Sequence, residues 1–119
     1  MVWFDRDSLP LHLIVETAGN PDFGQSPDVE HSPRMDLGVN TLREAITIAT
    51  RYRDSYDLGG GNWRRAEVLS AHTGRVVARI SYNGRAWRPG PYPQPEIDPN
   101  ASVEGLLALD SLLTDGEGR

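Results

Sequence analysis

Hydrophobic side chains at every second position mark the first predicted strand. Leu11, Leu13 and Val15 alternate with other residues between Pro10 and the turn-forming residues 19–21. A period of two is typical of a half-buried strand. The pattern therefore predicts a strand over residues 11–17, with these three side chains on one face.

A helical period follows at residues 41–56. Thr41 and Glu44 have the spacing of a capping box, in which the threonine hydroxyl accepts from the glutamate amide. Apolar side chains then recur at intervals of three and four residues, which is the spacing of one helix face: Leu42, Ala45, Ile46, Ala49, Tyr52 and Tyr56. Three glycines at positions 59–61 end the segment. The sequence thus predicts a helix whose apolar stripe covers a sheet.

A hairpin is predicted around residues 71–74. Their sequence suits a type I turn with Gly74 in the left-handed conformation, followed by a bulge. This turn pairs Leu69 with Val77 and Glu67 with Arg79. The opposite charges of the second pair favour this register.

A second hairpin is predicted at Asn83 and Gly84, because Asn-Gly is the strongest short hairpin signal. A two-residue turn at this point pairs Ile80 with Trp87. Trp87 would then share the core face with Val76, Ala78 and Ile80.

These elements predict one α+β domain over residues 1–119. Its small antiparallel sheet consists of a three-stranded meander and the N-terminal strand, packed on one helix. Three further segments complete it: a long irregular acidic loop over 18–38, a proline-rich spacer over 89–99, and a leucine-rich C-terminal helix over 100–114. Loops as long as the first are uncommon without a functional role or disorder.

Charge is uneven along the chain, although the formal total is only −5. Residues 1–38 carry seven acids and two arginines, residues 39–88 nine arginines and four acids, and residues 89–119 six acids and one arginine. Every basic residue other than histidine is arginine. A GC-rich genome explains this bias, and so does a surface selected to bind carboxylates, phosphates or aromatic faces.

Several kinds of functional site are excluded or disfavoured. The chain has no cysteine, so it forms no disulfide, thiolate metal site or cysteine nucleophile. It has no nucleophile elbow and no phosphate-binding loop with its lysine. His31 follows Asp28 and Glu30 but lacks recognised metal-ligand spacing. We therefore expect no enzyme activity, no catalytic residues, no metal and no cofactor.

Membrane insertion and export are not expected. Asp5 and Asp7 stand where a signal peptide carries basic residues. No stretch approaches the roughly 20 apolar residues that span a bilayer. The sequence predicts a cytoplasmic protein.

Binding to another protein is the function that these features favour. The predicted contact surfaces are the acids of the long loop and the leucine face of the last helix: Asp22, Asp28, Glu30, Asp36, Leu106, Leu109, Leu112 and Leu113. The acids would steer the chain toward a basic partner, and the leucine face could also form a homodimer or belong to the core. In size and charge the chain is similar to small phage and mobile-element proteins that inhibit a host nucleic-acid-handling complex.

Nucleic-acid binding is the alternative prediction. The basic middle segment interleaves guanidinium groups with aromatic rings, a mixture that holds phosphates and stacks bases. The residues that would form this surface are Trp63, Arg64, Arg65, Arg85 and Arg88. The acidic arms oppose it, since they repel a polyanion unless they fold away.

Overall fold

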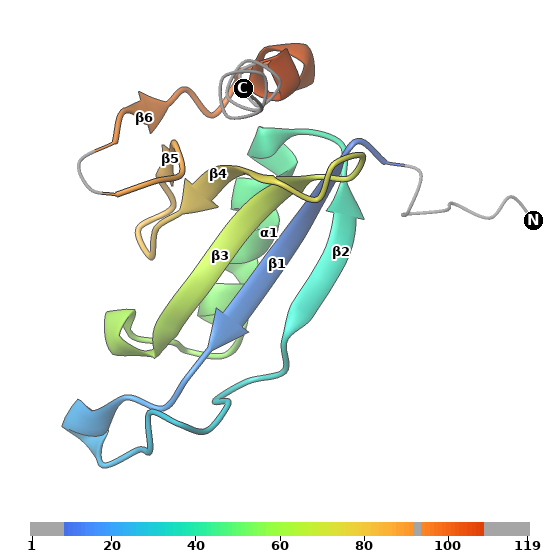
Figure 1. The fold of residues 1–119 in the computed structure, drawn as a ribbon. Helices are drawn as coiled ribbons and strands as arrows, with labels where there is room; N and C mark the ends of the chain where they lie inside the picture. The colour runs from blue at the N-terminus through green and yellow to red at the C-terminus, as the bar shows by residue number, and fades with distance from the viewer. Residues whose placement is uncertain (1–8, 92–93, 109–119) are drawn as a thin grey trace, which may run out of the picture.

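One six-stranded antiparallel sheet with a long helix on a single face forms the fold (Figure 1). The structure is a computed structural model that describes residues 9–91 and 94–108. The strands lie in the order β2-β1-β3-β4-β5-β6. The elements are β1 (Leu11–Thr17), η2 (Pro21–Phe23), β2 (Met35–Val39), α1 (Leu42–Ser55), η3 (Gly60–Asn62), β3 (Trp63–Ser70), β4 (Val76–Ile80), β5 (Ala86–Trp87) and β6 (Glu96–Ile97). The predicted small α+β fold is confirmed, with two more strands than expected.

The centre of the sheet is β1, which pairs with β2 on one side and with β3 on the other. Leu13 lies opposite Leu37 of β2 and Val68 of β3. Side chains opposite each other in an antiparallel pair point to the same face. The three strands therefore present one continuous apolar face to α1.

Helix α1 begins as its sequence predicts. The hydroxyl of Thr41 accepts a hydrogen bond from the amide of Glu44 at 3.0 Å. The Glu44 carboxylate in turn accepts from the amide of Asn40 at 3.1 Å. The predicted stripe is buried from Leu42 to Tyr52, whereas Tyr56, its predicted last member, is 44% exposed at the end of the helix. The cap and the apolar face up to Tyr52 are therefore confirmed, and the assignment of Tyr56 to that face is wrong.

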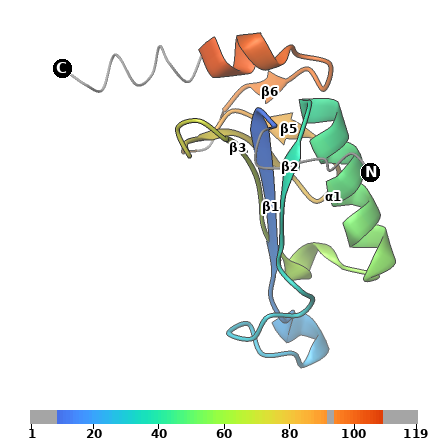
Figure 2. The ribbon, with the colours of Figure 1, turned by 90° about the vertical axis from the view of Figure 1, so that its right-hand side faces the viewer.

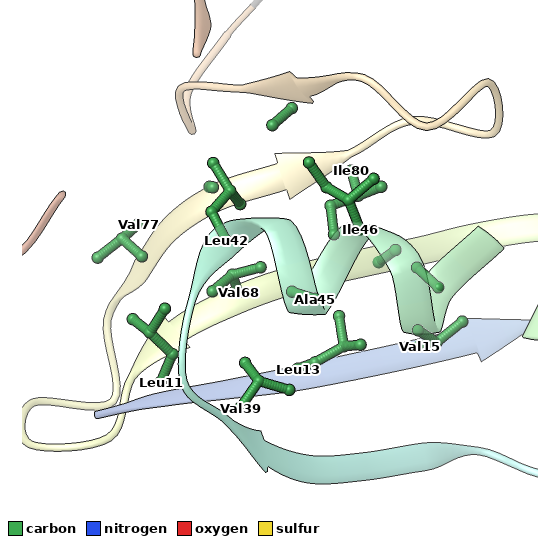
Figure 3. Close-up of a cluster of buried hydrophobic side chains, with 14 of the residues drawn as sticks. Leu11, Leu13, Val15, Val39, Leu42, Ala45, Ile46, Val68, Val77 and Ile80 are labelled. Carbon is green, nitrogen blue, oxygen red and sulfur yellow. The ribbon is translucent and has the colours of Figure 1, made fainter. Parts of the chain in front are cut away.

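The core lies between this stripe and the sheet (Figure 3). Its largest fully buried side chains come from α1 and from the first four strands: Leu11, Leu13, Val15, Val39, Leu42, Val68 and Val77, together with Leu106 near the end of the described chain. In Figure 2, α1 stands on one side of the sheet. No element of the described residues covers the other side, which we call the open face.

Strand β2 corrects the prediction of an irregular segment that continues to residue 38. Residues 35–39 form a strand, in which Met35 and Leu37 lie opposite Val15 and Leu13. The segment has the period of two that marks a half-buried strand. Its short length and the glycine at position 38 obscured this pattern. The irregular part therefore spans residues 18–34, and we call it loop 18–34.

The first hairpin keeps the predicted left-handed glycine, but four residues form its turn in place of three, because the amide of Ser70 donates to the carbonyl of Arg75 at 2.9 Å. Gly74 is left-handed, with φ of 76°, and Glu67 lies opposite Arg79 as predicted. Leu69, however, pairs with Val76 and not with Val77, because a bulge interrupts the ladder between Val68 and Leu69. The bulge buries Val77 completely. The predicted pair of Leu69 with Val77 is therefore wrong.

The second hairpin is shifted by one residue from the prediction. Ile80 pairs with Ala86, and Trp87 lies opposite Arg79. The amide of Ser81 donates to the carbonyl of Arg85 at 2.9 Å, so three residues form the turn in place of two. A shift of one residue moves every side chain of a strand to the other face. Trp87 therefore lies on the open face, and the small Ala86 occupies the core position.

The C-terminal part also differs from the prediction. Residues 96–97 of the predicted spacer form β6, which pairs with β5. Within the described chain, residues 103–108 are helical, three residues later than predicted. The hydroxyl of Ser102 accepts from the amide of Gly105 at 3.0 Å, and this cap explains the late start. Residues 109–114 lie outside the described residues.

Candidate functional site

Loop 18–34 extends from the end of the sheet opposite to the C-terminal helix (Figures 1 and 2). Three amide side chains hold its base. The Nδ2 group of Asn62 donates to the carbonyl of Ala18 at 2.9 Å and to Oε1 of Gln25 at 3.0 Å. The same Gln25 oxygen accepts from the amide of Asn20 at 2.8 Å. Because Asn20 and Asn62 are buried, these bonds are shielded from competing water.

Backbone contacts close the loop above this base. The amide of Gly19 donates to the carbonyl of Val29 at 3.0 Å, and the amide of Gln25 donates to the carbonyl of Asn20 at 3.1 Å. The side chain of Asn20 also caps η2 by accepting from the amide of Asp22 at 3.0 Å. The loop is therefore built by its own hydrogen bonds, as in an Ω-loop.

A buried network of hydroxyl groups attaches the last residues of the loop to α1. The hydroxyl groups of Thr17 and Ser32 lie 2.8 Å apart, and those of Ser32 and Tyr52 lie 2.8 Å apart. The Tyr52 hydroxyl also donates to the carbonyl of Pro33. Since these partners come from β1, the loop and α1, the network fixes the loop to the core.

The tip of the loop exposes hydrophobic side chains. Phe23, at the end of η2, is 75% exposed, and Val29 is 60% exposed. These two are the most exposed large hydrophobic side chains of the described residues. A projecting aromatic ring on a fixed backbone is a feature of many protein interfaces.

The four predicted loop acids do not form one cluster. Asp22 and Asp28 are exposed beside Phe23 and Val29, and neither carboxylate has a hydrogen-bond or ion-pair partner among the described residues. The carboxylate of Glu30 accepts from the amide of Arg34 at 2.6 Å. Asp36 belongs to β2 and pairs with the ring of His12 at 3.0 Å.

The open face of the sheet carries a chain of ion pairs across four strands. Its members alternate in sign as Asp36, Arg34, Glu16, Arg65, Glu67 and Arg79, with contacts of 3.4, 3.8, 2.8, 2.7 and 3.8 Å in that order. Three arginines balance three carboxylates, so this series of ion pairs has no net charge. Exposed ion pairs of this kind stabilise a fold only slightly. They make the open face polar without giving it a net charge.

A pocket of about 520 Å³ lies where this ion-pair chain meets β5. Its lining includes Trp63, Arg64, Arg65, Trp87 and Arg88, and also Glu67 and Arg79. Four of the five residues predicted for nucleic-acid binding therefore come together here. The fifth, Arg85, is outside the lining and pairs with Glu96 at 3.9 Å. We call this cavity the arginine–tryptophan pocket.

No protein-family model, curated protein or solved structure matches this chain.

The leucines predicted for partner binding are only partly described. Leu106 is 1% exposed and packs in the core. Leu109, Leu112 and Leu113 lie outside the described residues. Leu106 is therefore a core residue, which is one of the alternatives that the sequence allowed beside a partner or homodimer contact.

Two further findings concern the described residues, 9–91 and 94–108. No group of three histidine, aspartate or glutamate side chains is placed there to hold a metal ion. No helix in these ranges is long and apolar enough to cross a bilayer.

Sequence reasoning missed Phe23, Asn62 and Trp87 as parts of the candidate surfaces. Phe23 follows Pro21 and Asp22, and a proline at the first position of a helical turn was the available signal. The role of Asn62 depends on contacts with residues more than 35 positions away, for which the sequence holds no local signal. Trp87 was assigned to the core by the shifted register.

Proposed function

We propose that this chain is a non-catalytic protein-binding module that holds its partner with loop 18–34. The supporting observation is an exposed aromatic ring on an immobilised backbone: Phe23 is 75% exposed, whereas Asn20 at the base is 6% exposed. Buried aromatic side chains contribute much of the binding energy at protein interfaces. A loop that is already ordered loses little conformational entropy when it binds.

The neighbours of the exposed hydrophobic side chains suggest the chemistry of the partner. Asp22 precedes Phe23 and Asp28 precedes Val29 in the sequence. Each hydrophobic side chain is thus next in sequence to a carboxylate that has no partner among the described residues. A partner surface with an apolar socket and basic residues at its rim complements this arrangement.

The proposed partner is a protein of a nucleic-acid-handling complex in the cytoplasm, which this chain inhibits or assists. Such proteins present arginine and lysine to phosphates, and the carboxylates of loop 18–34 would occupy the same basic surface. Sedimentation at two concentrations determines whether the chain acts as a monomer or as a homodimer.

Capture from native lysate, with and without nuclease, tests this proposal. The two baits are the tagged full chain and its Phe23→Ala/Val29→Ser variant, followed by mass spectrometry. We expect one protein in near-equal amount with the wild-type bait under both conditions, and its loss with the variant. Equal recovery by both baits would exclude loop 18–34 as the contact. Recovery that depends on intact nucleic acid would contradict protein binding.

Neutralising the two unpaired acids is expected to slow association with the captured protein. Asp22→Asn/Asp28→Asn removes steering charge without touching Phe23, so the association rate at low salt should fall roughly three- to tenfold. The difference should disappear at high salt, where exposed charges are screened. Stopped-flow mixing measures both rates.

The matched control is Asp57→Asn/Glu104→Gln, which removes two exposed acids outside the loop. Its association rate at the same salt concentration should fall less than that of the loop variant, because charges at the contact surface steer the encounter more than charges elsewhere. Equal slowing in both double variants would mean that net charge, and not the loop, steers the encounter.

A further inference from the structure

The arginine–tryptophan pocket carries a net positive charge in a chain that is acidic overall. Four arginines and one glutamate contribute to its lining. Its volume of about 520 Å³ falls within the roughly 300–1,000 Å³ of small-ligand pockets. The pocket therefore has the size and the charge to hold an anionic group.

The four arginines that line this pocket are not equivalent. Arg65 and Arg79 share the Glu67 carboxylate, at 2.7 and 3.8 Å. Arg64 and Arg88 instead donate to the carbonyls of Pro27, at 2.7 Å, and Val77, at 3.0 Å. Neither of these two has a carboxylate partner among the described residues.

Arg64 and Arg88 are thus oriented but not neutralised. A carbonyl oxygen accepts from one N–H group of each guanidinium and carries no full negative charge. Arg64 also lines a second pocket with Glu16, Asp28 and Glu30, but it forms an ion pair with none of them. A guanidinium has five N–H donors in a fixed plane, so donors remain for a phosphate, to which arginine binds well.

The two tryptophans of the pocket are also held in place. Nε1 of Trp63 donates to the carbonyl of Ile80 at 3.1 Å, and Nε1 of Trp87 donates to the hydroxyl of Ser81 at 3.3 Å. Both residues are half-buried and line the pocket. Trp63 also packs against the core and meets the ring of Tyr82 edge-on, with the ring centroids 6.1 Å apart. Fixed, accessible aromatic rings are the surfaces on which unpaired bases stack.

We infer that the arginine–tryptophan pocket binds single-stranded nucleic acid. Arg64 and Arg88 hold phosphates, and Trp63 and Trp87 stack on bases. A peptide made of acids alone would satisfy the arginines but would leave both indoles without an aromatic or apolar partner, whereas a nucleic acid offers phosphates and bases together. This inference does not rest on protein binding by loop 18–34, although Arg64 contacts that loop at the carbonyl of Pro27.

Fluorescence anisotropy of a short labelled oligothymidylate tests the inference on the full chain at low ionic strength. We expect Arg64→Gln/Arg88→Gln to weaken binding roughly tenfold or more, because it removes two charge-assisted contacts. The slope of log K against log salt should become shallower by about 1.4, since each phosphate contact on a single strand contributes about 0.7.

Arg51→Gln/Arg75→Gln is the charge-matched control, because both arginines are exposed and lie outside the pocket lining. Its affinity should fall clearly less than that of Arg64→Gln/Arg88→Gln if the contacts are local, because distant charges add only a general attraction at low salt. Equal weakening in the two double variants, or no binding by the wild type, would overturn the inference.

Two competitors identify the ligand class. An abasic strand of the same length should compete poorly, because it offers phosphates without bases to stack. Polyglutamate should also compete poorly. If either competes as well as oligothymidylate, the pocket recognises negative charge alone and the inference fails.

Two further measurements keep the inference testable if the double variant does not fold. Arg64→Gln alone alters an exposed side chain and should still weaken binding several-fold, as expected for one charged contact. Oligothymidylate should also quench indole fluorescence in the wild type. Unchanged emission at saturation would contradict stacking on Trp63 and Trp87.

Discussion

Replacing Leu13 with alanine is expected to lower the free energy of unfolding by about 2–5 kcal/mol. Leu13 is 0% exposed and lies in the core cluster, between Leu37 and Val68 on the neighbouring strands. Removing its side chain loses transfer free energy and leaves a cavity beneath α1. Since small domains have only about 5–15 kcal/mol of stability, urea unfolding followed by circular dichroism should show a much lower midpoint.

Leu69→Ala provides the matched control for this substitution. Leu69 is also in the sheet, but it lies opposite His12 on the open face and is only half-buried. Its replacement should cost about 1 kcal/mol or less, because less apolar surface returns to water. Equal losses for the two variants would mean that the open face is as closely packed as the core face.

Gly19→Ala is expected to disrupt loop 18–34 while the sheet remains folded. A Cβ atom at this position would lie 2.1 Å from the carbonyl oxygen of Ser26. The obstacle is backbone and cannot rotate away, so the loop must open. Such overpacking costs about 1–3 kcal/mol. Hydrogen exchange should show faster exchange at the Gln25 and Val29 amides and unchanged protection in β1.

Gly60→Ala tests whether this effect is specific to the close approach. The nearest atom to a Cβ at Gly60 is Cδ1 of Tyr82 at 3.9 Å, an ordinary contact. Exchange in loop 18–34 should therefore remain as in the wild type. Wild-type protection in the Gly19→Ala variant would contradict the prediction, because it would show that the loop accommodates the added methyl group without opening.

The sequence identified the elements whose apolar positions follow a strict period. The strand over residues 11–17 and the capped helix over residues 42–55 needed no long-range information, because period, cap and turn residues are local. The pairing of Glu67 with Arg79 was expected from their opposite charges. It forms because the bulge after Val68 offsets a turn that is one residue longer than predicted.

Register beyond the turns was not predictable in the same way. Asn-Gly was expected to form a two-residue turn, but the chain uses three residues and moves Trp87 to the open face. At Val77 a single bulge decides which of two adjacent valines is buried. Both registers depend on which side chains pack against α1, and the residues of the turns do not determine this.

The candidate surfaces were predictable only in part. Composition indicated an arginine and aromatic surface, but residues 63–65 and Trp87 with Arg88 meet only because of the sheet order. Residue Arg85, in the same sequence cluster, lies outside the pocket. The order of loop 18–34 depends on Asn62, which is distant in sequence, so its acids could be named while its exposed Phe23 was overlooked.

The most direct test of the protein-binding account is the dissociation constant of the captured partner for Phe23→Ala, measured by calorimetry beside Tyr56→Ala. Tyr56 is also an exposed aromatic residue, 44% exposed, at the end of α1 and outside the loop. We expect Phe23→Ala to weaken binding roughly thirtyfold, the effect of an interface anchor of about 2 kcal/mol, and Tyr56→Ala to leave it within about twofold. Equal dissociation constants for wild type and Phe23→Ala would contradict the account.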